Sequence, residues 1–186
     1  MEHRSFLLLD ACSLINLYAS RHLPHIIGVR SERFGIVQNV YRESRFVFRG
    51  GDGPDRQTRE PIDWPALTSG LLDLLGDPTE EEAALYFDLS LELGDGEAMT
   101  GAVAYHRGYG VVSDDRKATG LLGELGIEVT SSLALVDHWA RQSGIESDAL
   151  QRVITDIRIR ARYIPARSHP LYEWWVTSAG ESGPER

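Results

Sequence analysis

The chain has 186 residues, a mass of 20.8 kDa, a sequence pI near 5.1 and a formal net charge of −9. With 42% hydrophobic and 25% charged residues and no apolar run near the ~18 residues of a membrane span, it is typical of a globular protein without a membrane segment, not of a disordered one. A single cysteine, Cys12, excludes an intrachain disulfide framework and a cysteine-rich zinc site, and it fits a reducing, cytoplasmic location.

The first half of the chain alternates strand and helix signals. The short apolar run Phe6–Leu9 ends at Asp10, which predicts a buried parallel strand and is too short for a signal peptide. The further elements predicted here are a helix over 14–18, a strand at 34–37, a helix at 41–47, a loop at 50–61 and a short helix at 67–75.

The second half continues the alternation. Asp77 as N-cap, with Pro78 after it, predicts the start of a helix that runs to about residue 93. The elements predicted after it are a helix at 95–107, a strand at 110–113, a helix at 116–125, a strand at 127–129, helices at 131–142 and 145–164, a Trp-rich segment at 171–176 and a disordered tail at 178–186. Strands that alternate with helices predict an α/β fold with a central parallel sheet covered on both faces.

Charge is segregated along the sequence. Residues 60–106 contain eleven acidic residues and no Lys or Arg, whereas 21–59 contain eight Arg against four acids, and 141–167 six Arg against three acids. Lys117 is the only lysine, and Arg is the better bidentate phosphate binder. These Arg residues are either solvated faces or contacts for a polyanion, so the acidic pI does not exclude a nucleic-acid partner.

Acidic residues are predicted to converge at one edge of the sheet. Two strands end in acids, at Asp10 and at Asp114, and ligands of open α/β sheets bind beyond the carboxyl ends of the strands. Glu97, in the first turn of a helix, and Glu43, in the helix after the second strand, are further candidates for this edge. Carboxylates that converge without a basic partner repel one another. Such a cluster is stable when a hard cation such as Mg²⁺ or Mn²⁺ binds to it and neutralises its charge. Such an ion can activate water and orient a phosphodiester, which indicates phosphodiester hydrolysis.

Each of these acids also has a purely structural interpretation. Asp10 could cap the helix that follows it, and Asp114 and Asp115 could be the N-cap and first-turn acid of the next helix. Asp95 fits an N-cap better than a ligand, and Glu43 taken alone fits a solvated helix residue. Taken together, in this order and on these elements, the acids indicate a functional site more strongly than any single acid does.

The combination resembles the PIN-domain nuclease family. The motifs are Asp10-Ala-Cys-Ser-Leu-Ile, Glu43, Gly94-Asp-Gly-Glu97-Ala, and Ser-Asp114-Asp115-Arg-Lys-Ala, and the last two, with Leu-Gly-Ile-Glu-Val next, are most similar to the bacterial branch related to VapC toxins. The likeness covers about residues 5–145. It departs from the family pattern at Cys12, where Ser, Thr or Asn is common and where Ser13 stands beside it.

The resemblance implies a three-layer α/β/α sandwich and a Mg²⁺- or Mn²⁺-dependent endoribonuclease, often the toxin of a toxin–antitoxin pair. It implies Asp10, Glu97 and Asp114 as metal ligands, with Glu43 and Asp115 completing the catalytic set. RNA is then the substrate, with an antitoxin protein and a second copy of the chain as possible partners. The alternative is a PIN-like module that binds RNA or protein without cutting it.

The organisation that follows has three parts. Residues 1–145 form the PIN-like domain, with an inserted loop and helix at about 49–76. Residues 146–177 form a C-terminal helical extension, and 178–186 form the tail. The extension carries two features left open: its tryptophans, Trp174 and Trp175, either dock the segment on the core or stack on bases, and its arginines, at positions 152, 158, 160 and 162, face RNA, a partner protein or solvent.

Other enzyme classes lack their signatures. There is no GxxxxGK phosphate-binding loop, and the six histidines show no metal-ligand spacing. A haloacid-dehalogenase-type phosphatase needs a second Asp two positions after the first, where this chain has Cys12. A response-regulator receiver needs its acidic pair early and its Lys late, whereas here Lys117 lies beside a late pair. A Cys12 thiol nucleophile has no paired His motif.

Overall fold

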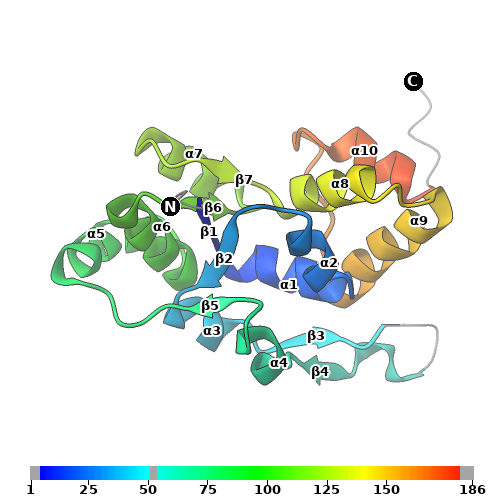
Figure 1. Cartoon of the computed structure of the whole chain (residues 1–186), viewed down its shortest axis with the longest axis horizontal. Coiled ribbons are helices and arrows are strands. Elements are labelled where there is room, and N and C mark those ends of the chain that lie inside the picture. Colours follow the sequence, from blue (N-terminus) through cyan, green and yellow to red (C-terminus); the bar gives the residue numbers. More distant parts are fainter. Residues whose placement is uncertain (1–4, 51–53, 181–186) are drawn as a thin grey trace. The chain divides into compact units, whose positions relative to one another are not determined.

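Five short strands form one parallel sheet in the order β5-β2-β1-β6-β7 (Figure 1). The structure is a computed structural model and describes residues 5–50 and 54–180. Helices flank the sheet, so the expected α/β class and α/β/α layering are confirmed. The strands of this sheet are β1 (Phe6–Leu9), β2 (Arg33–Ile36), β5 (Asp73–Leu74), β6 (Gly110–Val112) and β7 (Val129–Thr130).

The central strand explains why the sequence folds this way. All four residues of β1 are buried, because β2 and β6 pair with it on either side and helices cover its faces. The neighbouring strand β2 needs a glycine at Gly35: a Cβ there would lie 2.8 Å from the ring of Phe6 and 2.8 Å from the carbonyl oxygen of Asp73. The central strand is therefore a continuous apolar run, without the alternation of a strand that has one face in solvent.

Two compact units share the chain, and each is made of three segments. The first unit comprises residues 1–14, 30–45 and 62–132, and it contains the whole parallel sheet. The second comprises 15–29, 46–61 and 133–186, and it contains a two-stranded antiparallel sheet of β3 (Phe46–Phe48) and β4 (Arg59–Pro61). The chain therefore crosses from one unit to the other five times.

The helices follow the same division. Helix α1 (Ala11–Ala19) begins in the first unit and continues into the second. The other helices of the first unit are α3 (Gln38–Glu43), α4 (Trp64–Thr68), α5 (Glu80–Ser90), α6 (Asp95–Arg107) and α7 (Arg116–Glu124). Those of the second are α2 (Leu23–Gly28), the 3-10 helix η1 (Pro54–Gln57), α8 (Ser132–Gln142), α9 (Ser147–Asp156), the π-helical turn η2 (Ile157–Ala161) and α10 (Tyr172–Ser178).

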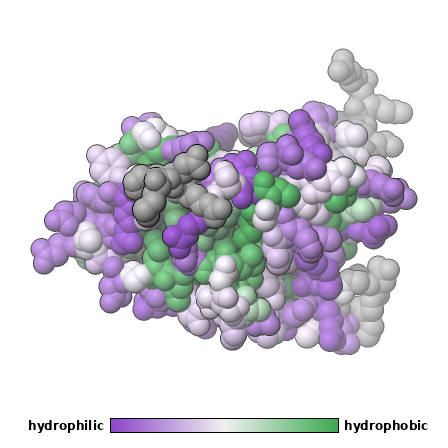
Figure 2. Space-filling model, in the orientation of Figure 1, coloured by the Kyte–Doolittle hydropathy of each residue, from purple (hydrophilic) through white to green (hydrophobic). Residues whose placement is uncertain are grey.

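Helix α6 packs closely against its neighbours in the first unit. A Cβ on Gly101 would lie 2.4 Å from Leu122 of α7 and 3.2 Å from Leu89 of α5. At Gly101 the close neighbours of α6 are therefore two other helices. Glu80 and Glu81 in the first turn of α5 are exposed, whereas Glu82 is buried and pairs with Arg107. Figure 2 shows hydrophilic side chains at the left of the view, where α5 lies in Figure 1.

Some predicted boundaries are wrong for identifiable reasons. The N-cap of α5 is Thr79, not Asp77, because Thr79 and Glu82 form a reciprocal capping box. The helix predicted at 41–47 ends at Glu43, and β3 begins three residues later. The helix predicted at 67–75 is instead α4, capped by Asp63, followed by β5.

The predicted loop at 50–61 is partly ordered. Its last residues, Arg59–Pro61, pair with β3, while residues 51–53 lie outside the described part. The helix predicted at 145–164 is divided into α9 and η2 and ends at Ala161. Of the predicted tail, 178–180 end or follow α10, and 181–186 lie outside the described residues. Across the described ranges, no helix has both the length and the apolarity needed to cross a bilayer.

Candidate functional site

The candidate site lies at the carboxyl edge of the parallel sheet, where the order of the strands reverses. From β1 the chain proceeds to β2 and β5 on one side, and β6 and β7 lie on the other. Asp10 directly follows β1, and Ser113 and Asp114 follow β6. The backbone N–H of Asp10 donates to the carbonyl of Val112 at 3.1 Å, so the two strand ends are neighbours. In open α/β sheets this reversal is where ligands bind.

Ser13 joins the first and fourth predicted acids. Its backbone N–H donates to Oδ1 of Asp10 at 2.6 Å, and its hydroxyl donates to Oδ2 of Asp114 at 3.2 Å. The backbone N–H of Ser132 donates to Oδ1 of Asp114 at 2.9 Å. Ser13, not Cys12, therefore supplies the hydroxyl at this point in the motif.

Asp10 is both a helix cap and a buried, incompletely paired carboxyl. Its residue is 1% exposed, and while Oδ1 accepts from the first turn of α1, Oδ2 has no hydrogen-bond partner among the described residues. Burial raises the pKa of Asp10 to about 7, and repulsion from Asp114 adds to the shift. Hydrogen bonding by the hydroxyl of Ser113, and by the N–H and hydroxyl of Ser13, opposes it. A buried carboxylate oxygen without a donor is the kind of atom that a cation can satisfy.

Glu43 and Glu97 meet at the amino end of α6. Oε1 of Glu43 accepts from the backbone N–H of Gly96 at 2.9 Å, and Oε2 of Glu97 accepts from the N–H of Gly94 at 3.1 Å. The positive end of the helix favours both carboxylates. Burial nevertheless raises the pKa of Glu43, helped by the charges of Asp95 and Glu97. It also raises the pKa of Glu97, helped by Asp115.

Two neighbouring acids have structural roles. Asp115 is the N-cap of α7, accepting from the N–H of Ala118 at 2.8 Å. Asp95 is not the N-cap of α6, because Gly94 takes that position. Instead Asp95 accepts from the side-chain amide of Asn39 at 3.1 Å and from the hydroxyl of Tyr86.

Four acidic side chains of the site surround Cys12 with negative charge. Partial burial of the thiol raises its pKa to about 12, and Asp10, Glu97, Asp114 and Asp115 each add to the shift. A thiol surrounded in this way stays protonated at neutral pH, which argues against a Cys12 nucleophile. No Arg or Lys in the described ranges pairs with Asp10, Glu43 or Glu97.

All five predicted residues thus belong to one edge of the first unit, in two hydrogen-bonded groups. One group is Asp10, Ser13 and Asp114, with Asp115 next in sequence, and the other is Glu43 and Glu97 at α6. As the side chains stand, no three His, Cys, Asp or Glu residues of the described ranges form a metal-ligand cluster. Each of the five instead accepts a hydrogen bond from a backbone N–H.

The sequence did not single out the polar residues that hold these acids. Ser132 lies eighteen positions after Asp114 and donates through its backbone, so residue type gave no signal for it. Asn39 and Tyr86 reach Asp95 from α3 and α5, which only the fold brings to α6.

The C-terminal segment belongs to the second unit. Trp175 and Val176 of α10 are buried, and α10 packs against α9, which favours docking over base stacking for Trp175. Arg160, left open as a surface residue, is buried. No protein-family model matches the chain, and neither does any of the curated proteins or solved structures compared with it.

Proposed function

We propose that the chain is a PIN-like, Mg²⁺- or Mn²⁺-dependent endoribonuclease whose site is the acidic edge of the first unit. The observation that carries this proposal is the buried Asp10 carboxyl, whose Oδ2 has no hydrogen-bond partner in the described residues, beside Asp114 at the reversal of the sheet. Asp10, Glu97 and Asp114 would hold the ion, and Glu43 and Asp115 would complete the site.

The donor set suits a hard divalent ion, because carboxylate oxygens are the ligands that Mg²⁺ and Mn²⁺ prefer. When bound, the ion would supply Lewis-acid activation of water and neutralise charge on the scissile phosphate. The chain itself supplies the positioning. Ser13 fixes the spacing of Asp10 and Asp114 through its N–H and hydroxyl, and Ser132 fixes the second oxygen of Asp114.

Glu43 and Glu97 would act through the first turn of α6. Both are held by backbone N–H groups, and both have a raised pKa. A carboxylate whose ionisation is disfavoured in this way can accept a proton from water more readily than an exposed one.

The first test is RNA cleavage by the purified chain with Mn²⁺, on structured and unstructured RNA. Asp114→Asn removes one ligand charge but keeps an oxygen for Ser132, and we expect it to lower the cleavage rate by more than about a hundredfold. The matched control is Asp73→Asn, which removes the same charge from the exposed Arg33–Asp73 pair and should leave the rate unchanged.

Chelation by EDTA should stop cleavage, and fresh Mn²⁺ should restore it. Absence of cleavage by the wild type, together with absence of Mn²⁺ binding in calorimetry, would refute the nuclease. RNA binding without cleavage would instead favour the alternative, a PIN-like binding module.

The toxin role is a further proposal and has its own readout. Expression of the wild type alone should arrest growth, and expression of Asp114→Asn at equal level should not, because only the RNA chemistry differs. An adjacent gene for a small partner protein, whose co-expression restores growth, would identify the antitoxin. Normal growth with demonstrably active wild type would remove the toxin role and leave the nuclease. Sedimentation of the purified chain would test the proposed homodimer.

A further inference from the structure

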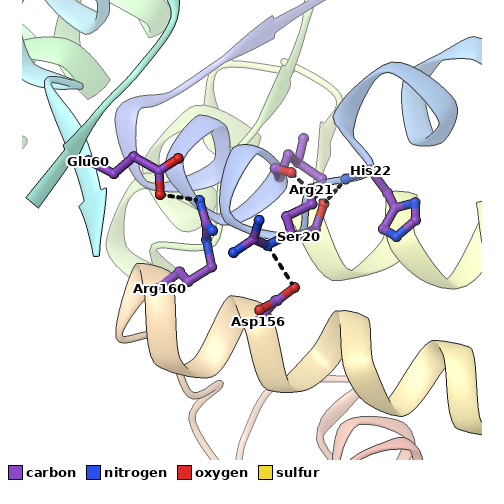
Figure 3. A network of polar contacts seen from close by, with 7 residues as sticks. Ser20, Arg21, His22, Glu60, Asp156 and Arg160 are labelled. Carbon is purple, nitrogen blue, oxygen red and sulfur yellow. Dashed lines mark hydrogen bonds and ion pairs between the residues drawn. The ribbon is translucent and has the colours of Figure 1, made fainter. Parts of the chain in front are cut away.

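The second unit contains a buried arginine on an unusual turn. Helix α9 runs directly into η2, a π-helical turn. Such turns are rare in proteins, and those that occur often lie at functional sites. The turn directs Arg160 inward, so its side chain is only 3% exposed (Figure 3). A buried guanidinium is costly unless its donors are paired.

The pairing of Arg160 is incomplete. Its Nη2 donates to Oε2 of Glu60 at 3.2 Å, while Nε and Nη1 have no hydrogen-bond partner among the described residues. A well-matched Arg–carboxylate pair forms two parallel bonds of about 2.7–2.9 Å. Glu60 makes one longer bond, and its own side chain is 45% exposed. Glu60 therefore covers the guanidinium from the solvent side without satisfying it.

The strands next to this arginine combine cations with aromatic rings. Strand β3, which packs against η2, carries Phe46 and Phe48. The guanidinium of Arg59 lies 4.2 Å from the ring centroid of Phe46, and that of Arg162 lies 3.6 Å from that of Phe48. Proteins that bind single-stranded nucleic acid commonly combine cationic side chains with aromatic rings on which bases stack.

The backbone of this region is strained at Arg162. Arg162 ends η2 with φ at 56°, in the left-handed region, where a residue with a side chain costs about 1 kcal/mol relative to glycine. A glycine would end the turn more cheaply but would remove the cation over Phe48. The strained residue is thus the one whose guanidinium lies over the ring of Phe48.

We propose that Glu60 holds the place of an RNA phosphate, and that Arg160, flanked by Arg59 and Arg162, binds the backbone of single-stranded RNA when the Glu60 carboxylate turns out to solvent. The identity of the polymer rests on the proposed ribonuclease function. A phosphate presents two oxygens to the guanidinium fork, where Glu60 presents one. The carboxylate of Glu60 has room to turn because its side chain is 45% exposed.

The test is RNA binding without cleavage. Wild-type protein in EDTA is titrated into a short fluorescein-labelled oligouridylate, and anisotropy gives Kd over a range of salt concentrations. Glu60→Gln removes the competing charge, so we expect tighter binding. Arg160→Met is expected to weaken binding by about tenfold and to reduce the slope of log Kd against log salt by about 0.7, the value for one lost phosphate contact on a single strand.

Helix α8 of the same unit offers matched controls. Asp137 and Arg141 form an ion pair four residues apart in which Arg141 is 72% exposed. Asp137→Asn and Arg141→Met make the same changes in net charge as the two test variants. They should alter Kd by less than roughly twofold, because neither residue belongs to β3, β4 or η2.

The outcomes separate the interpretations. If Glu60→Gln binds no more tightly than wild type and Arg160→Met binds equally well, the pair is a structural brace and the proposal fails. If Arg160→Met does not fold by circular dichroism, Glu60→Gln alone decides. If poly-glutamate displaces the oligouridylate more strongly than inorganic phosphate does, the partner is an acidic protein and the RNA assignment fails. Binding as expected without cleavage in Mn²⁺ would refute the nuclease alone.

Discussion

At the scale of single residues, Asp10 combines three constraints in one carboxyl group. It caps α1, adjoins Asp114 and is buried, with one oxygen that lacks a hydrogen bond in the described structure. The sequence predicted its position at a strand end, because the apolar run stops there. It did not predict the burial, which arises because the helix begins at the very next residue.

Stability of the metal-free protein should therefore fall as pH rises. The pKa of Asp10 is about 7 when folded and near 3.8 otherwise, so the folded state holds its proton more tightly between these values. The favourable contribution is fully present below about pH 4 and is lost as pH rises through 7. The whole loss is about 4 kcal/mol, of which about 3 kcal/mol falls between pH 5 and pH 8. Urea unfolding in EDTA at pH 5 and pH 8 measures it.

Asp10→Asn provides the control, since the amide oxygen can still accept from Ser13 and does not titrate. The variant should lose most of the difference between the two pH values and should be the more stable protein at pH 8. Equal pH dependence in wild type and variant would contradict the assignment of the shift to Asp10.

At the scale of elements, α6 shows what sequence can and cannot predict. Its range was predicted from the segment Gly94-Asp95-Gly96-Glu97 that opens it, and the predicted helix at 95–107 has the bounds of α6. The residues that contact this first turn were not predicted, because Glu43 reaches Gly96 from another helix, 53 residues earlier in the chain. The hairpin of β3 and β4 was missed for a different reason: turn-forming residues dominate 50–61, and Arg59–Pro61 has no apolar alternation.

Gly96→Ala tests whether the α6–Glu43 contact matters for activity. A Cβ at this position would lie 2.6 Å from Oε2 of Glu43, so the carboxylate must move off the Gly96 N–H. Because Glu43 can rotate away, we expect a stability change below about 1 kcal/mol but a cleavage rate lowered by about tenfold.

Gly120→Ala in α7 is the matched control. Nothing lies within 4 Å of a Cβ there, so this exposed helix position should gain about 0.5–1 kcal/mol and retain wild-type cleavage. Thermal unfolding and RNA cleavage are measured on both variants. Wild-type activity in Gly96→Ala would show that Glu43 does not need its helix contact.

At the scale of the whole molecule, the net charge divides between the two units. The segments of the first unit contain eighteen acidic and eight basic residues, and those of the second contain ten and eleven. The sequence showed alternating acidic and basic stretches, but only the fold assigns them to separate bodies. The acidic unit carries the proposed metal site, and the nearly balanced one carries the proposed RNA contact.

Hydrogen exchange should distinguish the two units. Mn²⁺ without RNA should slow exchange in the first turn of α6 and around Asp114, because ligand binding stabilises the residues that hold it. Oligouridylate in EDTA should slow exchange in β3 and η2. Protection of the same segments by both additions would contradict two separate binding sites, and mass spectrometry of peptic peptides resolves these segments.

The chain crosses between the two units five times, and this order determines when the acidic edge can be completed during synthesis. Asp114 is held by the backbone of Ser132, so the acidic edge is incomplete until that residue has left the ribosome. By then the first unit is fully made, whereas the second still lacks every residue from 133 onward. A prematurely released fragment ending before Ser132 would lack the full site, and no single cut in the chain would separate the two units. A growing chain with the proposed activity would thus be harmless to its own message until synthesis is well past its midpoint.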